Sequence, residues 1–226
     1  MDNKKKEKVV ILGTAHGKNV AGKRSPDGRL TEYMYSREVV GLLRRDLEGA
    51  GLKVYVDMME TEVPMPQSAE LRERCAFVNG LCSKYGAGNC AYVSVHVNAA
   101  GSGKWGTAGG WSAYTSSGDT EADKLASFLY TSAEKWLKRY AAELEAGKES
   151  GMYGKNQRAI RRDFSDGDAD LEAGFYVLQH TRCAAVLTEN LFMDNRRDVQ
   201  YLLSPEGKRA IVGLHREAIM AYMGRR

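Results

Sequence analysis

The sequence predicts an α/β protein with three layers, in which helices cover both faces of a mostly parallel central sheet. Short apolar runs alternate along the chain with longer segments whose apolar residues recur at helical spacing. The short runs are apolar throughout, as in strands that are buried on both faces of a parallel sheet. With 226 residues and 43% hydrophobic content, the chain can form one substantial core. We therefore expect a single domain over residues 1–226, with an ordered core from about 8 to 223.

The first half contains three predicted strands, and the third carries His96 near its end. The expected elements are a strand over 8–12, a Gly-rich loop at 13–17, a helix over 31–50, a strand over 53–57, a helix over 69–85 and a strand at 92–100. Gly51 ends the first helix, and Pro64 and Pro66 precede the second. This alternation of strands and helices is typical of a parallel sheet.

The second half is expected to complete the sheet and to add three helices. In order, we expect a strand over 110–114, one long amphipathic helix over 119–146, an insertion over 147–173, short strands over 175–178 and 184–188, a helix over 195–203 and a helix from Ser204-Pro205 to about Met223. Asp194 is expected to cap the first of the last two helices. The insertion, rich in Gly, Asp and Arg, is expected to lie over the carboxyl edge of the sheet.

Composition argues against several classes of partner. The net charge of +4 suits an anionic polymer but is too small to indicate nucleic acid binding. The densest basic cluster, formed by Arg158, Arg161 and Arg162, is expected to be a solvated surface rather than a phosphate site. No segment is long enough to span a membrane. No Cys-x-x-Cys pair is present, and we expect four free thiols, at Cys75, Cys82, Cys90 and Cys183.

Groups with acid-base or metal-binding chemistry follow three of the predicted strands. His16 comes directly after the first strand, His96 lies at the end of the central strand, and Glu189 follows the strand at 184–188. Ligands of open α/β sheets bind beyond the carboxyl ends of the strands, so these side chains are expected to meet there. A histidine that is simply satisfied by a backbone carbonyl is the alternative for His96.

The first helix supplies a fourth candidate, and helical geometry favours Glu32 over Glu38. The inner face of this helix runs through Ser36, Val40, Leu43 and Leu47. Glu32 lies four residues before Ser36 on the same face, whereas Glu38 is rotated away from it. Two neutral imidazoles and a carboxylate suit a catalytic zinc ion with an open position, and a second carboxylate such as Glu189 can then act as the base. His180 and His215 are expected to be structural or exposed to solvent.

Four motifs resemble those of the zinc-dependent N-acetylmuramoyl-L-alanine amidases of the amidase-3 type. They are the Gly-x-x-His-Gly loop at 13–17, Leu30-Thr31-Glu32, Ser94-Val95-His96-Val97-Asn98-Ala99 and Val186-Leu187-Thr188-Glu189-Asn190-Leu191-Phe192. Two details differ from the usual family pattern: the first loop begins Gly-Thr-Ala, and Asn190 follows the glutamate. The resemblance implies that His16, Glu32 and His96 bind Zn²⁺ and that Glu189 is the catalytic carboxylate.

The resemblance also implies a substrate and a place of action. The enzyme would cleave the amide between N-acetylmuramic acid and L-alanine in peptidoglycan, and would act on the cell wall in a periplasmic or extracellular space. The apolar run at 9–13 is shorter than the core of a signal peptide, about 7 to 15 residues, so we expect no signal peptide in this chain. A leaderless phage-type lysin or a trimmed wall amidase fits this expectation.

Two other functions are weighed against the amidase. A zinc carboxypeptidase of similar fold is expected to use a His-x-x-Glu pair, but Asn19 stands three residues after His16. A non-catalytic wall-binding domain is expected to lack a ligand or the base, whereas all four residues are present in the sequence.

Overall fold

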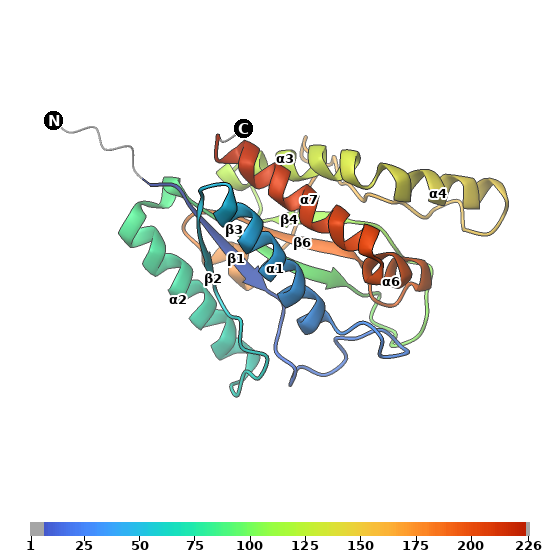
Figure 1. Ribbon diagram of the computed structural model, residues 1–226, viewed down its shortest axis with the longest axis horizontal. Helices are drawn as coiled ribbons and strands as arrows, with labels where there is room; N and C mark the ends of the chain where they lie inside the picture. The colour runs from blue at the N-terminus through green and yellow to red at the C-terminus, as the bar shows by residue number, and fades with distance from the viewer. Residues whose placement is uncertain (1–6, 225–226) are drawn as a thin grey trace.

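The structure is a computed structural model that describes residues 7–224. It contains a six-stranded sheet in the order β2-β1-β3-β6-β4-β5 (Figure 1). The strands are β1 (Val9–Thr14), β2 (Lys53–Val56), β3 (Cys90–Asn98), β4 (Ser112–Thr115), β5 (Leu171–Glu172) and β6 (Ala184–Phe192). All neighbouring pairs are parallel except β4 and β6, which are antiparallel. The mostly parallel sheet expected from the sequence is therefore confirmed.

Helices cover both faces of this sheet. On one face lie α1 (Glu32–Gly49), α3 (Glu121–Trp136) and α7 (Pro205–Tyr222), and on the other lie α2 (Gln67–Tyr85) and the short α5 (Tyr176–Gln179) (Figure 1). Successive residues of β1 show why its apolar run is continuous: Val10 and Leu12 belong to the core under α1 and α7, while Val9 and Ile11 belong to the core under α2. This arrangement confirms the three layers.

The segment expected to form one long helix is divided in two. Helix α3 ends at Trp136, and α4 (Lys138–Glu149) begins after Leu137, whose backbone leaves the helical region at φ −95° and ψ 9°. Leu137, Tyr140 and Leu144 are all buried. The apolar spacing thus continues across the break, which is why the sequence does not reveal it.

The prediction of a strand at 175–178 is wrong. Residues Tyr176–Gln179 form helix α5, and the amide of His180 donates to the carbonyl of Tyr176. Val177 and Leu178 pack against the core under α2 from this single turn. A short apolar run supports a buried helical turn as well as a strand, and only the packing decides between them.

The helix start expected at Asp194 is also displaced. Asn195 is the N-cap of α6 (Arg196–Leu203), and its side chain accepts hydrogen bonds from the amides of Arg197 and Asp198. Asp194 instead accepts a hydrogen bond from the amide of Ala100. The cap of α7 is as expected, because Ser204 accepts from the amide of Gly207 and Pro205 follows it.

The cysteines and the helices also bear on expectations from the sequence. All four cysteines are free, as expected. Within residues 7–224, none of the helices combines the length and apolar character needed to cross a membrane. The expectation about a signal peptide rests partly on residues 1–6, which lie outside the described part of the chain.

Candidate active site

The candidate residues meet at the carboxyl ends of three adjacent strands. His16 follows β1, His96 lies near the end of β3, and Glu189 is the register partner of His96 on β6. Glu189 therefore lies within β6, which is longer than the strand expected over 184–188. Glu32 is the first residue of α1 and is buried. The topology thus brings together residues that are far apart in the sequence.

Three of these side chains converge closely enough to share one metal ion. Oε1 of Glu32 lies 3.1 Å from Nδ1 of His96, and Oε2 lies 3.8 Å from Nε2 of His16. One ligand atom from each of the three residues lies within 4.8 Å of the other two. The imidazole rings stand nearly perpendicular, at 87°, with centroids 5.3 Å apart.

The backbone around His16 is held by a serine on the inner face of α1. Ser36 Oγ accepts a hydrogen bond of 2.8 Å from the amide of Ala15 and donates one of 2.6 Å to the carbonyl of Val95. Ser36 therefore connects the loop after β1 to β3. His16 itself has a backbone φ of 29°, which residues other than glycine rarely adopt. Its neighbours must hold the backbone in this conformation.

The donor chemistry fits a zinc ion. Burial lowers the pKa of His16 to about 3, so its imidazole is neutral and offers a lone pair. Among residues 7–224, Oε2 of Glu32 is buried without a hydrogen-bond partner, which is costly unless a cation or donor occupies the adjacent position. Ser94 Oγ lies 3.0 Å from Nε2 of His96, so it can orient this ring while Nδ1 binds a metal.

Glu189 has the environment of a carboxyl group that can hold a proton. Burial and the negative charge of Glu32 raise the pKa of Glu189 well above its ordinary value. Its Oε2 is buried and has no hydrogen-bond partner in the described part of the chain. The next residue, Asn190, points to the other side, where it accepts from Trp111 Nε1 and donates to the carbonyl of His96. This unusual asparagine thus supports the strand ends rather than the groove.

A groove of about 260 Å³ opens beside these residues, on the sheet face covered by α2 and α5. Its lining includes His16, His96 and Glu189, together with Lys23, Arg74 and residues 175–177. Lys23 Nζ lies 4.0 Å from Oε2 of Glu32, so it brings a positive charge to the edge of the candidate metal site. Nothing in the sequence of its loop distinguishes this lysine from other exposed lysines.

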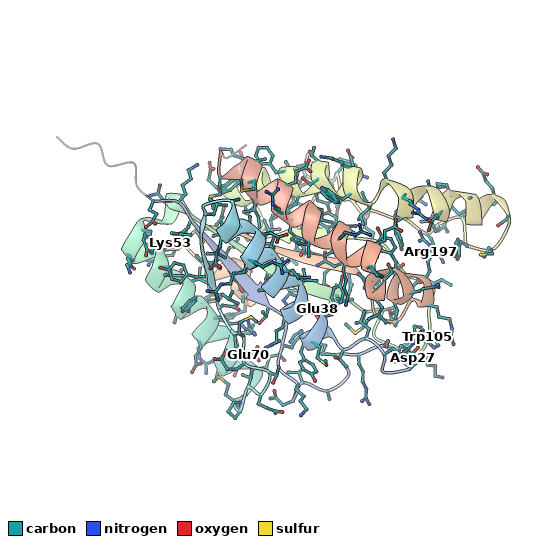
Figure 2. The ribbon with its side chains drawn as sticks, viewed as in Figure 1. Asp27, Glu38, Lys53, Glu70, Trp105 and Arg197 are labelled. Atoms are coloured by element: carbon teal, nitrogen blue, oxygen red, sulfur yellow. The ribbon has the colours of Figure 1, made fainter. Side chains whose placement is uncertain are left out.

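A second residue that the sequence analysis missed is Arg74 on α2. Its buried guanidinium pairs with Asp57 at 2.8 Å and with Glu70 at 2.8 Å. Asp57 in turn accepts a hydrogen bond from the amide of Thr14, close to the loop that carries His16. Glu70 lies near the N-terminal end of α2 (Figure 2). The sequence does contain a signal that Arg74 is buried, because it lies four residues before Val78 on the same face of the helix.

The remaining candidates lie outside the cluster. Glu38 is exposed on α1, where it pairs with Lys208 of α7 at 2.6 Å (Figure 2). His215 is fully buried between Thr188 and the carbonyl of Ile211, so it is structural. His180 is exposed and stacks on Tyr176, which fits the solvent-facing role expected from the sequence.

Comparisons with known proteins agree on one family. The family model described as N-acetylmuramoyl-L-alanine amidase matches residues 10–221. None of the curated proteins matches the chain. The chain resembles the solved amidase from Clostridium difficile 630 with a TM-score of 0.71 at 17% identity, covering 97% of this chain and 98% of that one.

Two further solved structures show the same fold. The catalytic domain of CwlV from Bacillus (Paenibacillus) polymyxa var. colistinus gives a TM-score of 0.67 at 17% identity, over 97% of this chain and 99% of that chain. The amidase AmiC2 of Nostoc punctiforme gives 0.68 at 17% identity, over 96% and 98%. Since the family model spans residues 10–221, the chain belongs to the N-acetylmuramoyl-L-alanine amidase family known as Amidase_3.

Proposed function

We propose that this protein is a zinc-dependent amidase that hydrolyses the amide between N-acetylmuramic acid and the L-alanine of the stem peptide in peptidoglycan. The observation that carries the proposal is the convergence of His16, Glu32 and His96 within 4.8 Å, at the end of the strand that pairs with Glu189. Family membership supports the reaction class. We further propose that residues 1–226 act as a single catalytic domain and that the protein works on the cell wall.

In this proposal His16, Glu32 and His96 hold the zinc ion. A bound zinc ion supplies Lewis acidity towards the scissile carbonyl and lowers the pKa of the attacking water. Glu32 balances part of the positive charge with a carboxylate whose Oε2 accepts no hydrogen bond from residues 7–224. Ser94 and Ser36 hold His96 and the His16 loop in place, so little rearrangement is needed on binding.

Glu189 is proposed to move the proton. Its carboxylate accepts a proton from the attacking water and then donates that proton to the nitrogen of the departing L-alanine. The burial and the neighbouring negative charge of Glu32 raise the pKa of Glu189 and so favour this exchange, because they make its carboxylate a stronger proton acceptor. The groove along α2 and α5 gives the substrate access to the same edge of the sheet.

The identity of the bond is tested by digesting peptidoglycan sacculi and measuring the masses of the products. The proposal expects free stem peptides with a new amine on L-alanine, together with intact glycan strands that carry no peptide. New reducing ends would instead indicate a glycosidase. Loss of only the terminal D-alanine would indicate a carboxypeptidase, and no change with any wall substrate would favour a binding domain.

A further inference from the structure

A second groove, of about 820 Å³, lies on the other side of β4 from the candidate active site. It forms between the loop before β4 and residues 154–164, and it is larger than the active-site groove of about 260 Å³. Four of its lining residues are cations, Lys155, Arg158, Arg161 and Arg162, and none is acidic. The arginine cluster expected to be a solvated surface therefore lines a groove.

Three of these cations lack an acidic partner. Arg162 forms an ion pair with Glu134 and stacks on Tyr130, so its charge is compensated. Lys155, Arg158 and Arg161 have no carboxylate within 4.0 Å among the described residues. Neighbouring positive charges repel one another, and together they favour a ligand that carries negative charge.

The backbone holds two of these arginines in fixed positions. The amide of Trp111 donates to the carbonyl of Ala159 at 2.9 Å, and the amide of Arg161 donates to the carbonyl of Trp111 at 2.8 Å. Gly110 has a φ of 105°, and a Cβ there would lie 2.3 Å from the carbonyl oxygen of Arg158. Only glycine permits this close approach, so the segment lies against the start of β4.

Strand β4 lies between the proposed catalytic carboxylate and one wall of this groove. Ser112 of β4 pairs with Glu189 of β6, and the segment around Ile160 bridges to Trp111 on the outer side of β4. This segment is separated from β6 by two strand spacings, a distance of about 10 Å. The guanidinium of Arg161 extends back towards β6, where it lies 5.2 Å from the ring centroid of Phe192.

This separation matches the reach of a stem peptide. An extended peptide spans about 3.3–3.6 Å per residue, so carboxylates two or three residues beyond the scissile amide lie about 7–11 Å from it. Arginine binds carboxylates through two parallel hydrogen bonds. We propose that Lys155, Arg158 and Arg161 bind the free carboxylates of the stem peptide while its first amide lies beside Glu189. This inference rests on the proposed amidase function.

The first test measures cleavage of a soluble muramoyl tripeptide with free carboxylates and of the same compound with those carboxylates amidated. The parent protein is expected to have the lower KM for the free acid. Lys155→Gln/Arg158→Gln should raise that KM about tenfold with little change in kcat, and should leave the amidated compound unaffected. Arg209→Gln/Arg216→Gln, which removes the same charge from α7, should behave as the parent. Equal KM values for the two compounds in an active parent would overturn the inference.

The second test does not depend on cleavage. Calorimetry measures binding of the free stem tripeptide, and of poly(glycerol phosphate), to the parent and to both double variants. The inference expects the tripeptide to bind the parent, with about tenfold weaker binding to Lys155→Gln/Arg158→Gln alone. If the parent binds tripeptide in this way but cleaves no wall substrate, only the proposed function fails. Tighter binding of the phosphate polymer, or tripeptide binding that is equal in all three proteins, would overturn the inference.

Discussion

His96 is the residue whose replacement tests zinc binding most directly. It lies between Glu32 and Ser94, so His96→Ala should remove a ligand without disturbing the loop of His16. We expect this variant to lose its zinc on dialysis, as measured by elemental analysis. Glu38→Ala is the matched control, because Glu38 is exposed and pairs with Lys208 away from the candidate site; it should keep one zinc per chain. Equal zinc in His96→Ala and the parent would contradict the ligand assignment.

Replacing Glu189 separates metal binding from proton transfer. Glu189→Gln keeps the shape of the side chain but cannot accept a proton. We expect it to retain zinc and a native circular dichroism spectrum, yet to lose about two to four orders of magnitude in kcat on a wall substrate. Loss of zinc from this variant would show that Glu189 is a ligand, and an unchanged rate would show that it is structural.

Individual residues differ in how much of their role the sequence predicts. Glu32 could be preferred to Glu38 because helical spacing places it on the face of Ser36 and Val40, and the structure buries Glu32 and exposes Glu38. Lys23 could not be found in this way, since loops have no fixed period. Its approach to Glu32 depends on the course of the whole loop before α1, which only the structure gives.

At the scale of a single helix, Arg74 connects α2 to the loop that carries His16 in the candidate active site. Arg74→Ala would leave Asp57 and Glu70 buried without a cation, which typically costs about 3 to 5 kcal/mol of the free energy of unfolding. Urea unfolding should report this loss. Arg72→Ala, on the exposed face of the same helix, should change the free energy by less than about 0.5 kcal/mol. Similar losses in both variants would argue against the role given to the network.

The elements that were wrongly predicted share a physical cause. The turn of α5 and the break at Leu137 are both decided by packing against neighbouring elements, and neither contains a glycine or proline within the apolar run. In contrast, Gly51 marks the C-terminal end of α1, and Ser204-Pro205 marks the start of α7. Both boundaries agree with the structure. The displaced cap of α6 is a choice between adjacent residues that both suit the role.

At the scale of the whole molecule, His215 makes stability depend on pH. Burial between α7 and β6 lowers its pKa to about 4, against an ordinary value of 6.5. The unfolded chain therefore binds a proton first as pH falls below 6.5, and the stability from this residue is lost between about pH 6.5 and 4. Denaturant unfolding of His215→Gln and the parent at several pH values measures the effect.

The difference in free energy of unfolding between the parent and His215→Gln is expected to become smaller as the pH falls. At pH 7 the parent should be more stable than His215→Gln, and this advantage should shrink by about 3 kcal/mol by pH 4. Asp198 acts in the opposite direction, because burial raises its pKa to about 6, but it is present in both proteins and cancels in the comparison. An advantage that is constant over this range would contradict a buried neutral His215.

The class of fold was predictable because strands that are buried on both faces of a sheet need continuous apolar runs, and these runs can be recognised in the sequence. The continuous apolar runs of β1, β3 and β6 require burial on both faces, and this leaves a three-layer arrangement as the natural solution. The antiparallel direction of β4 was not predictable, since a strand's residues do not encode the direction of its neighbour. The same limit hid the basic groove, whose walls come from two segments that precede and follow β4 in the sequence, residues 107–109 and 154–164.

The position of β6 in the sheet has a consequence for how the protein comes to be active during synthesis. This strand is the last in sequence, yet it lies between β3 and β4. A nascent chain that has emerged only as far as Cys183 can pair β2, β1 and β3, and separately β4 and β5, but the strand that pairs with both groups is still missing. Such a chain also lacks Glu189. In the proposed mechanism a product truncated before β6 lacks both a central strand and the proton-transferring carboxylate, so we expect it to have no hydrolase activity.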